Sequence, residues 1–204
     1  MVTKVYLVRD ILSTGYNKNI FVGSLDLEVS ELGVRQLEAV RNYFKDFPVE
    51  VIYSSPLIRA KKTAKAIAEE TDIKSIKNDD RLKEINAGKL EGLPFDEISK
   101  IYPQVKLLWE TMPQKFEAVG GEKMTDVYNR ITKAVLDISA ENEGKKVAIV
   151  SHGTAIRNFL SYALGRSIDF ISVTPMIGHG TVAELEIENG EVVSVNMLNI
   201  QSFN

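Results

Sequence analysis

Charged side chains directly follow several apolar stretches of this sequence, and their types suit the binding of an anion. Arg9 and Asp10 come after one apolar run, and His152 comes after another. Arg59 lies a few residues beyond a third such run. In an open parallel sheet, ligands bind beyond the carboxyl ends of the strands, so we expect these side chains to converge. Two arginines and a histidine at one sheet edge predict a pocket for a phosphate or a carboxylate.

Each of these residues, taken alone, has a simpler explanation. Arg59 could be a solvated helix arginine, and His152 could be a hydrogen-bonded core histidine. Glu84, in the segment RLKEINAGKLEG, would ordinarily be a loop acid paired with a lysine. Only their common placement at strand ends favours a binding site over scattered charges.

The elements that must position these residues alternate between strands and helices. This alternation predicts an α/β architecture with a mainly parallel sheet. Residues 5–8, 49–55 and 145–153 are predicted strands, and the last is almost continuously apolar, as expected when both faces of a sheet are covered. Near the C-terminus, an alternating segment contains Asn189-Gly190, a strong signal for a hairpin.

Three helices are predicted between the strands, and each carries a start signal. The first follows Ser30, which can cap it. The second begins at Pro56 with Ser55 as its cap, and Thr154 caps the third, which ends at Gly165. The first helix is predicted to bury a stripe of four residues: Val34, Leu37, Val40 and Phe44.

Composition limits the possible functions. The 204 residues suffice for one large domain with its own core, and the net charge of −3 predicts neither a nucleic-acid partner nor an anionic membrane surface. The absence of cysteine excludes disulfides, thiol catalysis and zinc–thiolate sites. No apolar run is long enough to cross a bilayer, and the N-terminus carries no leader, so a cytoplasmic location is expected.

The combined pattern resembles the histidine phosphatase superfamily, in its phosphoglycerate-mutase-like branch. Five segments carry the resemblance in order between residues 4 and 199: LVR, SSPLIRAKKTA, EINAGKLEG, GGE at 120–122 and VAIVSHGTAIRNFL. The resemblance implies a phosphoglycerate-mutase-like α/β/α sandwich, three layers around a mainly parallel mixed sheet. A single domain over 1–204 is expected, with 93–118 as a cap-like insertion over the pocket.

Members of that family transfer a phosphoryl group to a histidine after the first strand. By position, the resemblance implies that Arg9, Arg59 and His152 bind the phosphoryl group and that Glu84 donates a proton to the leaving oxygen. Asn17 corresponds to a phosphate-binding asparagine if the loop is shifted by one residue. No cofactor and no metal are implied.

This sequence departs from the family where the nucleophile belongs, because Asp10 occupies the position of the histidine. Val22 and His179 also stand where the family often has glutamine and asparagine. The shifted register would align three loop residues with a family-like threonine, aromatic residue and asparagine: Thr14, Tyr16 and Asn17. Since the departures cluster around the pocket, natural divergence is the favoured explanation.

An aspartate cannot simply replace the histidine. Its side chain is shorter, and a small misplacement of the attacking atom costs about a hundredfold in rate. Its charge also opposes a phosphate dianion and can pair with Arg9. We therefore expect no phosphohistidine chemistry at position 10.

Three functions are compatible with these residues. The favoured one is a diverged protein that binds a phosphate ester or a similar small anion, with catalysis lost or greatly weakened. The alternative is an active phosphomonoesterase that uses Asp10, as nucleophile or base, or His152; hydrolysis is favoured over a mutase reaction, which needs a long-lived phosphoenzyme. The third is a metal site built from Asp10, His152, His179 and Glu84, which the nearby arginines disfavour by repulsion.

Overall fold

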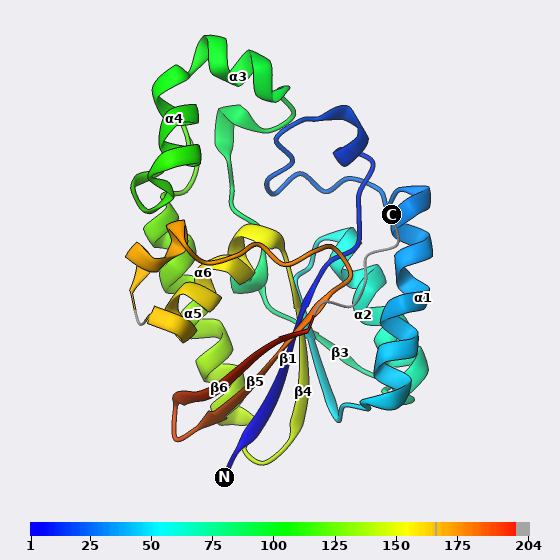
Figure 1. Ribbon diagram of the computed structural model, residues 1–204. Helices are drawn as coiled ribbons and strands as arrows, with labels where there is room; N and C mark the ends of the chain where they lie inside the picture. The colour runs from blue at the N-terminus through cyan, green and yellow to red at the C-terminus, as the bar shows by residue number, and fades with distance from the viewer. Residues whose placement is uncertain (166, 199–204) are drawn as a thin grey trace.

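The computed structural model describes residues 1–165 and 167–198, which build a mixed, mainly parallel sheet of six strands in the order β3-β2-β4-β1-β5-β6 (Figure 1). The first four strands in the chain are parallel; β5 is antiparallel to β1, and β6 is antiparallel to β5. The strands are β1 (Thr3–Arg9), β2 (Val51–Ser54), β3 (Ile76–Asn78), β4 (Lys146–Ser151), β5 (Val182–Glu188) and β6 (Glu191–Leu198). The predicted α/β class is confirmed.

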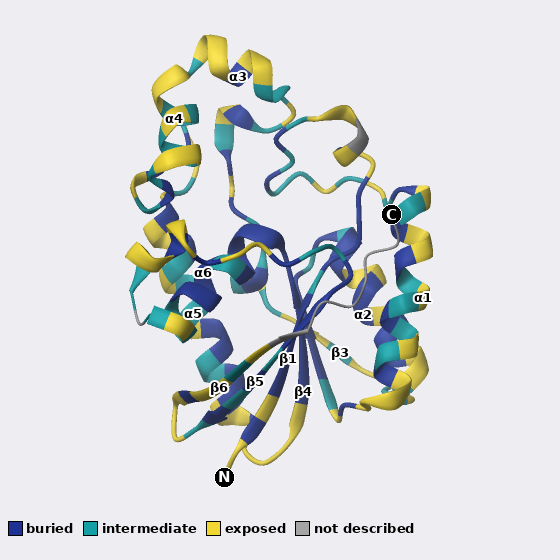
Figure 2. Ribbon diagram, in the orientation of Figure 1, coloured by how far each residue is buried: buried dark blue, intermediate teal, exposed yellow. Residues whose placement is uncertain are grey.

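Helices cover both faces of this sheet. Helices α1 (Glu31–Asp46) and α2 (Ile58–Thr71) lie on one face, and α5 (Met124–Glu141) and α6 (Gly153–Gly165) lie on the other (Figure 1). The central strands β1, β2 and β4 between them are largely buried (Figure 2). The predicted three-layer α/β/α arrangement is therefore confirmed.

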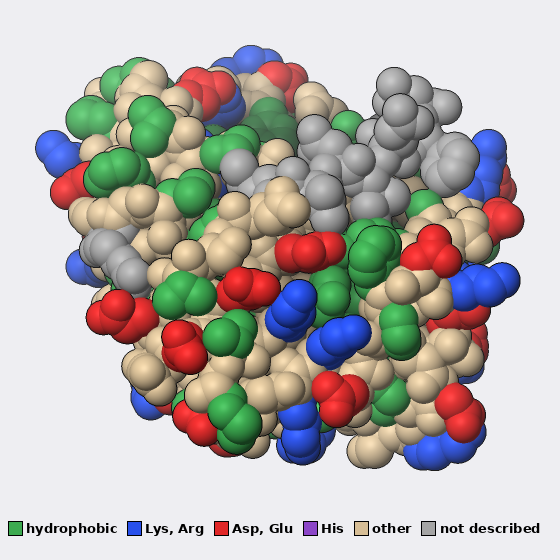
Figure 3. Space-filling model, turned by 60° about the horizontal axis from the view of Figure 1, so that its bottom comes forward, with side chains coloured by type: hydrophobic (Ala, Val, Ile, Leu, Met, Phe, Trp, Pro, Cys, Tyr) green, Lys and Arg blue, Asp and Glu red, His purple; other side chains and the backbone are tan. Residues whose placement is uncertain are grey.

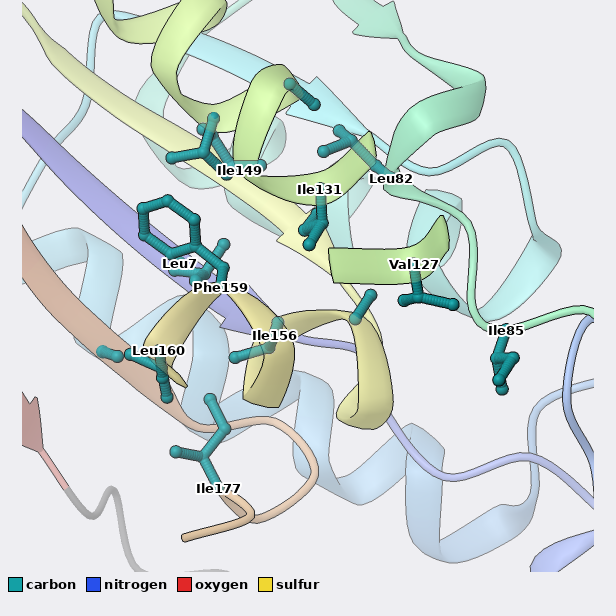
Figure 4. Packing of buried hydrophobic residues seen from close by; sticks show 14 of the residues in the cluster. Leu7, Leu82, Ile85, Val127, Ile131, Ile149, Ile156, Phe159, Leu160 and Ile177 are labelled. Carbon is teal, nitrogen blue, oxygen red and sulfur yellow. The ribbon is translucent and has the colours of Figure 1, made fainter. Parts of the chain in front are cut away.

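Alternation along the strands supplies one core to each face. In β1, Leu7 points to the side of α5 and α6, and its neighbour Val8 points to the side of α1 and α2. Figure 4 shows Leu7 in one cluster with Ile131 of α5 and with Ile156 and Phe159 of α6. All four of these clustered side chains are fully buried.

The stripe predicted for the first helix is partly wrong. Val34 is 56% exposed, whereas the buried face of α1 consists of Gly33, Gln36, Val40 and Phe44. Gly33 lies so close to the site loop that a Cβ atom there would stand 2.2 Å from the Leu12 carbonyl oxygen. This close approach determines which face of α1 is turned toward the sheet. Ser30 caps the helix as predicted, accepting a hydrogen bond from the Gly33 amide.

The caps predicted for the other two helices are wrong. Helix α2 begins two residues beyond Pro56, and Asp26 from a distant loop accepts a hydrogen bond from its first amide, that of Ile58. Helix α6 begins at Gly153, so Thr154 lies inside it, and a distant carboxylate caps it instead. Sequence proximity could not reveal caps supplied from elsewhere in the fold.

The segment 93–118 contains two short helices, α3 (Phe95–Ile101) and α4 (Pro103–Thr111). The predicted hairpin is also confirmed, since Asn189 and Gly190 have φ angles of 51° and 78° and join β5 to β6. Short 3-10 helices complete the described elements: η1 (Tyr16–Lys18), η2 (Asp80–Leu82), η3 (Gly88–Leu90), η4 (Pro113–Lys115) and η5 (Ile168–Ser172).

Helix hydrophobicity and surface charge indicate which kinds of partner the protein could contact. None of the helices in the described residues is long and apolar enough to cross a membrane. On the face shown in Figure 3, acidic and basic side chains alternate without forming a continuous basic area. This mixture fits the small net charge of −3.

Candidate active site

The register of the three central strands brings the predicted residues to one edge of the sheet. In the parallel pairs, Arg9 lies opposite Ser151, and Ser54 lies opposite Val150. The three strands therefore end side by side, and the residues that follow them emerge together. Asp10 and His152 are thus neighbours although 142 positions separate them in the chain.

A cavity of about 520 Å³ opens at this edge, and it brings together five of the six predicted site residues. They are Arg9, Asp10, Arg59, Glu84 and His152. The sixth, Asn17, has its backbone in η1, but its side chain lies outside the described part of the structure.

The Asp10 carboxylate lies at the centre of the charged groups and is only 2% exposed. Its Oδ2 atom forms an ion pair with Arg59 Nε at 2.7 Å and lies 3.1 Å from His152 Nδ1. Its Oδ1 atom is 4.0 Å from His179 Nδ1. Burial by itself would raise the pKa of Asp10, but His152, Arg59 and His179 outweigh that effect and hold the pKa well below its usual range. Asp10 is therefore ionised at neutral pH.

Arg59 is held from several sides. Besides its ion pair with Asp10, its Nη1 and Nη2 atoms donate to the carbonyl oxygens of Leu25 and Gly23, at 2.7 and 2.9 Å. The residue is 4% exposed. All three nitrogens of the guanidinium thus have protein partners, and an incoming anion would have to share or displace them.

Arg9 is positioned through His179. Arg9 Nη2 lies 2.7 Å from His179 Nε2, and His179 Nδ1 lies 2.9 Å from the Asp10 carbonyl oxygen. A carbonyl can only accept, so we assign the ring proton to Nδ1, which leaves Nε2 to accept from Arg9. Burial, followed by the positive charge of Arg9, lowers the pKa of His179 to about 4. His179 is therefore neutral at pH 7 and serves as an acceptor for Arg9.

His152 is 1% exposed and makes a hydrogen bond through one ring nitrogen. Its Nε2 atom is 2.7 Å from Ser55 Oγ, while Nδ1 approaches the Asp10 carboxylate at 3.1 Å without the alignment of a hydrogen bond. Because Ser55 Oγ already accepts from the Leu57 amide, its hydroxyl proton is available for Nε2. Nδ1 then carries the ring proton and faces the anionic side of the cavity.

Glu84 lies across the cavity and is the distant cap of α6. Its Oε2 accepts from the Thr154 amide at 2.9 Å, and its Oε1 accepts from Ala155 at 3.2 Å and from Ile85 at 2.9 Å. A carboxylate at a helix N-terminus is favoured by the unpaired amides there. This cap aims Glu84 toward the helix that follows His152.

The loop that carries Glu84 is anchored by a residue that the sequence did not single out. Arg130 donates to the carbonyl oxygens of Arg81, Lys83 and Glu84, and it forms an ion pair at 2.7 Å with Glu122. Glu122 belongs to the GGE segment, and its carboxylate also accepts from the Asn86 amide. The GGE segment thus fixes the acidic loop without reaching the cavity.

Some residues of the loop after Asp10 line the cavity, and others do not. Ser13 and Tyr16 line the cavity, whereas Thr14 is exposed and lies outside it. Val22 and His179, whose types depart from the family pattern, both line it. Of the residues that the shifted register aligns with the family, Tyr16 therefore lies at the cavity, whereas Thr14 points away from it beside the bridge between Ser13 and Val29. The register itself stays a prediction.

Sequence reasoning missed most of the apolar wall of this cavity. The wall comes from the loop before α1, from α3 and α4, from the loop that carries Glu84 and from the segment between η5 and β5. Its members include Ile20, Phe21, Ile85, Phe95, Trp109 and Met176.

The described residues contain no group of three or more histidine, cysteine, aspartate or glutamate side chains that could hold a metal ion. The alternative of a carboxylate–imidazole metal site therefore finds no ligand cluster in this part of the molecule. The two arginines beside Asp10 explain why the charges here suit an anion better than a cation.

The fold is an α/β/α sandwich with a charged cavity at the ends of its central strands, and comparison with known proteins identifies the family to which it belongs. The model of the histidine phosphatase superfamily (branch 1) matches residues 5–200. The chain therefore belongs to this superfamily.

Individual relatives agree with this assignment. Phosphoserine phosphatase 1 of Hydrogenobacter thermophilus is 33% identical over 162 residues, which cover 79% of this chain and 76% of the relative. YhfR of Bacillus stearothermophilus superposes with a TM-score of 0.90 at 25% identity, covering 98% and 100% of the two chains. A mutant phosphoserine phosphatase from Entamoeba histolytica, solved with phosphoserine, has a TM-score of 0.81 at 25% identity, covering 99% and 100%. The family thus binds phosphorylated substrates.

Proposed function

We propose that this protein is a phosphomonoesterase that hydrolyses a small phosphate ester bound at the charged end of the cavity. One observation carries the proposal: two arginines, a buried histidine and two carboxylates converge on a single cavity in a chain of this family. Cationic groups that surround transferred phosphoryl oxygens stabilise the charge of the transition state. The names of the relatives support hydrolysis.

In this proposal Asp10 occupies the place of the family's phosphate-accepting histidine. Its lowered pKa keeps it ionised, and its contacts with Arg59 and His152 are both made to Oδ2. Oδ1 is then the oxygen that attacks phosphorus, while the ester P–O bond breaks and the leaving oxygen takes its proton from Glu84. Water subsequently cleaves the aspartyl phosphate and restores the carboxylate. If Asp10 instead acted as a base on water, the same cationic side chains would bind the phosphoryl oxygens.

A second candidate function rests on a different observation. The two arginines are already balanced by two carboxylates, and all three guanidinium nitrogens of Arg59 have protein partners. A phosphate dianion would meet a site with little net positive charge. This favours a protein that binds a small phospho-ligand with turnover lost or greatly weakened.

Hydrolysis of an aryl phosphate by four proteins separates the two candidates: wild type, Asp10→Asn, Asp10→Ala and Asp10→His. Phosphate release should be measured from about pH 5 to about pH 8. The esterase proposal expects wild-type turnover that falls at least about a hundredfold in Asp10→Asn and Asp10→Ala. The exposed Asp46 provides a matched control, Asp46→Asn, which should retain full activity.

The outcomes point in different directions. Wild-type turnover that is indifferent to Asp10→Asn would reject Asp10 as nucleophile or base and would leave His152 as the candidate. An inactive wild type together with an active Asp10→His would show that the phosphate-binding side chains are in place and that only the nucleophile is missing. That result would favour the binding function and end the esterase proposal.

A further inference from the structure

We infer that the cavity selects phosphate monoesters of a neutral aromatic or apolar alcohol over esters that carry a second charged group. This inference rests on the proposed function, because it concerns the part of the substrate that leaves. The observation behind it is that the residues lining the cavity form a charged group and a separate aromatic group.

The ionisable residues that line the cavity engage one another or the backbone at one end. Arg59 pairs with Asp10, Arg9 contacts His179, and Glu84 is held by the amides that begin α6. Among residues 1–165 and 167–198, no lysine and no third arginine lines this cavity. A carboxylate on the leaving group would therefore be buried away from any cation, at a substantial desolvation cost.

Another part of the cavity wall is aromatic, and its rings contact one another. The rings of Phe21 and Trp109 are 4.8 Å apart between centroids in an edge-on arrangement, and those of Phe21 and Phe95 are 5.6 Å apart. These rings join the loop before α1 to α3 and α4, in the segment that we propose acts as a cap. Such a preformed surface favours an aromatic or apolar ligand.

Lys106 is a basic side chain that contacts this aromatic wall, and it already has a carboxylate partner. Lys106 of α4 lies 6.0 Å from the centroid of the Phe95 ring, and it forms an ion pair with Glu110 one turn along the helix. It does not line the cavity. Among the described lining residues, a phosphorylated amino acid or phosphoglycerate would thus find no lysine and no third arginine to pair with its carboxylate.

Binding can be measured without relying on turnover, because Trp109 is the only tryptophan of the chain and lines the cavity. Calorimetry and tryptophan fluorescence should compare phenylphosphonate with phosphonoacetate, neither of which is an ester. We expect phenylphosphonate to bind at least about tenfold more tightly. In parallel, hydrolysis of phenyl phosphate should exceed that of phosphoserine by a similar factor in kcat/KM.

Two kinds of variant test the cause. Trp109→Ala should weaken phenylphosphonate binding about tenfold in calorimetry while leaving inorganic phosphate binding unchanged. Val22→Lys places a cation in the half-buried apolar wall and should shift preference toward phosphonoacetate, whereas the matched neutral control Val22→Met should not. The second pair keeps the test valid if Trp109→Ala fails to fold.

The inference and the proposed function fail in different ways. Preferential binding of phenylphosphonate without any hydrolysis would end the esterase proposal and uphold the selectivity. Equal or better binding and turnover of the carboxylate-bearing compounds would overturn the selectivity while leaving the esterase intact. Binding of neither phosphonate would also overturn it.

Discussion

Replacing Asp10 by asparagine should destabilise the fold and tighten phosphate binding for the same reason. The carboxylate and Arg59 are 2% and 5% exposed, and their closest atoms are 2.7 Å apart. Asparagine keeps the shape but removes the charge, which leaves the Arg59 guanidinium buried without a counter-ion. Breaking one side of such a pair costs about 3 kcal/mol, at the lower end of the usual range because two carbonyl oxygens still accept from Arg59. For a chain of 204 residues this corresponds to a melting temperature lower by about 6 to 12 °C.

The uncompensated arginine should then attract an external anion. We expect inorganic phosphate to bind Asp10→Asn at least about tenfold more tightly than wild type, since one repulsive charge is gone and one attractive charge is released. A phosphate concentration near a hundred times Kd would return about 2.7 kcal/mol of stability. Phosphate should therefore raise the melting temperature of the variant more than that of wild type.

Thermal unfolding with and without phosphate, together with calorimetric titration, measures both effects. Asp46→Asn is the control, because it removes the same charge from an exposed position. A loss below about 1 kcal/mol would contradict the buried pairing, since that is the range of exposed ion pairs. Unchanged or weaker phosphate binding would show that Asp10 does not compete with ligands for Arg59.

Three further predictions follow from single contacts. The pKa of His179 falls from 6.5 to about 4 on folding, so the unfolded state takes up the extra proton at a higher pH than the folded state. The free energy of unfolding should therefore be at its full value above about pH 6.5 and decline by about 3 kcal/mol toward pH 4. Urea unfolding of His179→Asn should show a flatter dependence on pH. Arg130→Met should reduce turnover or ligand binding without contacting the ligand, because that guanidinium holds the loop of the proposed acid, while Lys133→Met on the same helix should not; equal effects would refute this role. Gly33→Ala should lower the free energy of unfolding by about 2 kcal/mol or more, and with it the melting temperature, although alanine normally favours helices. A higher melting temperature would show that α1 does not lie in close contact with the Leu12 carbonyl.

The fold was largely predictable because its signals are local and repeated. The continuous apolar run of β4 needs cover on both faces, and the Asn189-Gly190 pair fits the positive φ angles of a tight hairpin. The caps were not predictable, because Asp26 and Glu84 reach α2 and α6 from distant loops. A side chain that completes a helix from elsewhere in the chain leaves no mark at that helix's own start.

The site was predictable in its membership but not in its pairing. Placement at strand ends was enough to bring Arg9, Asp10 and His152 to one cavity. The sequence alone suggested that Asp10 would pair with Arg9, whereas its ion pair is with Arg59 and Arg9 turns to His179. The choice of arginine depends on side-chain rotamers and on the positions of loop carbonyl oxygens. Neither can be predicted from a sequence pattern.

Asp10 must satisfy two demands that at first conflict. A carboxylate that holds Arg59 and His152 in place is stabilised by them, and that stabilisation lowers its reactivity toward phosphorus. The structure divides these demands between the two oxygens, since both contacts are made to Oδ2 while Oδ1 is 4.0 Å from His179 Nδ1. Attack by Oδ1 would remove the carboxylate charge just as the phosphoryl oxygens arrive, and Arg59 and His152 would exchange one anion for another. The same pairing that makes Asp10 a structural counter-ion would thereby keep the site electrostatically balanced through the reaction.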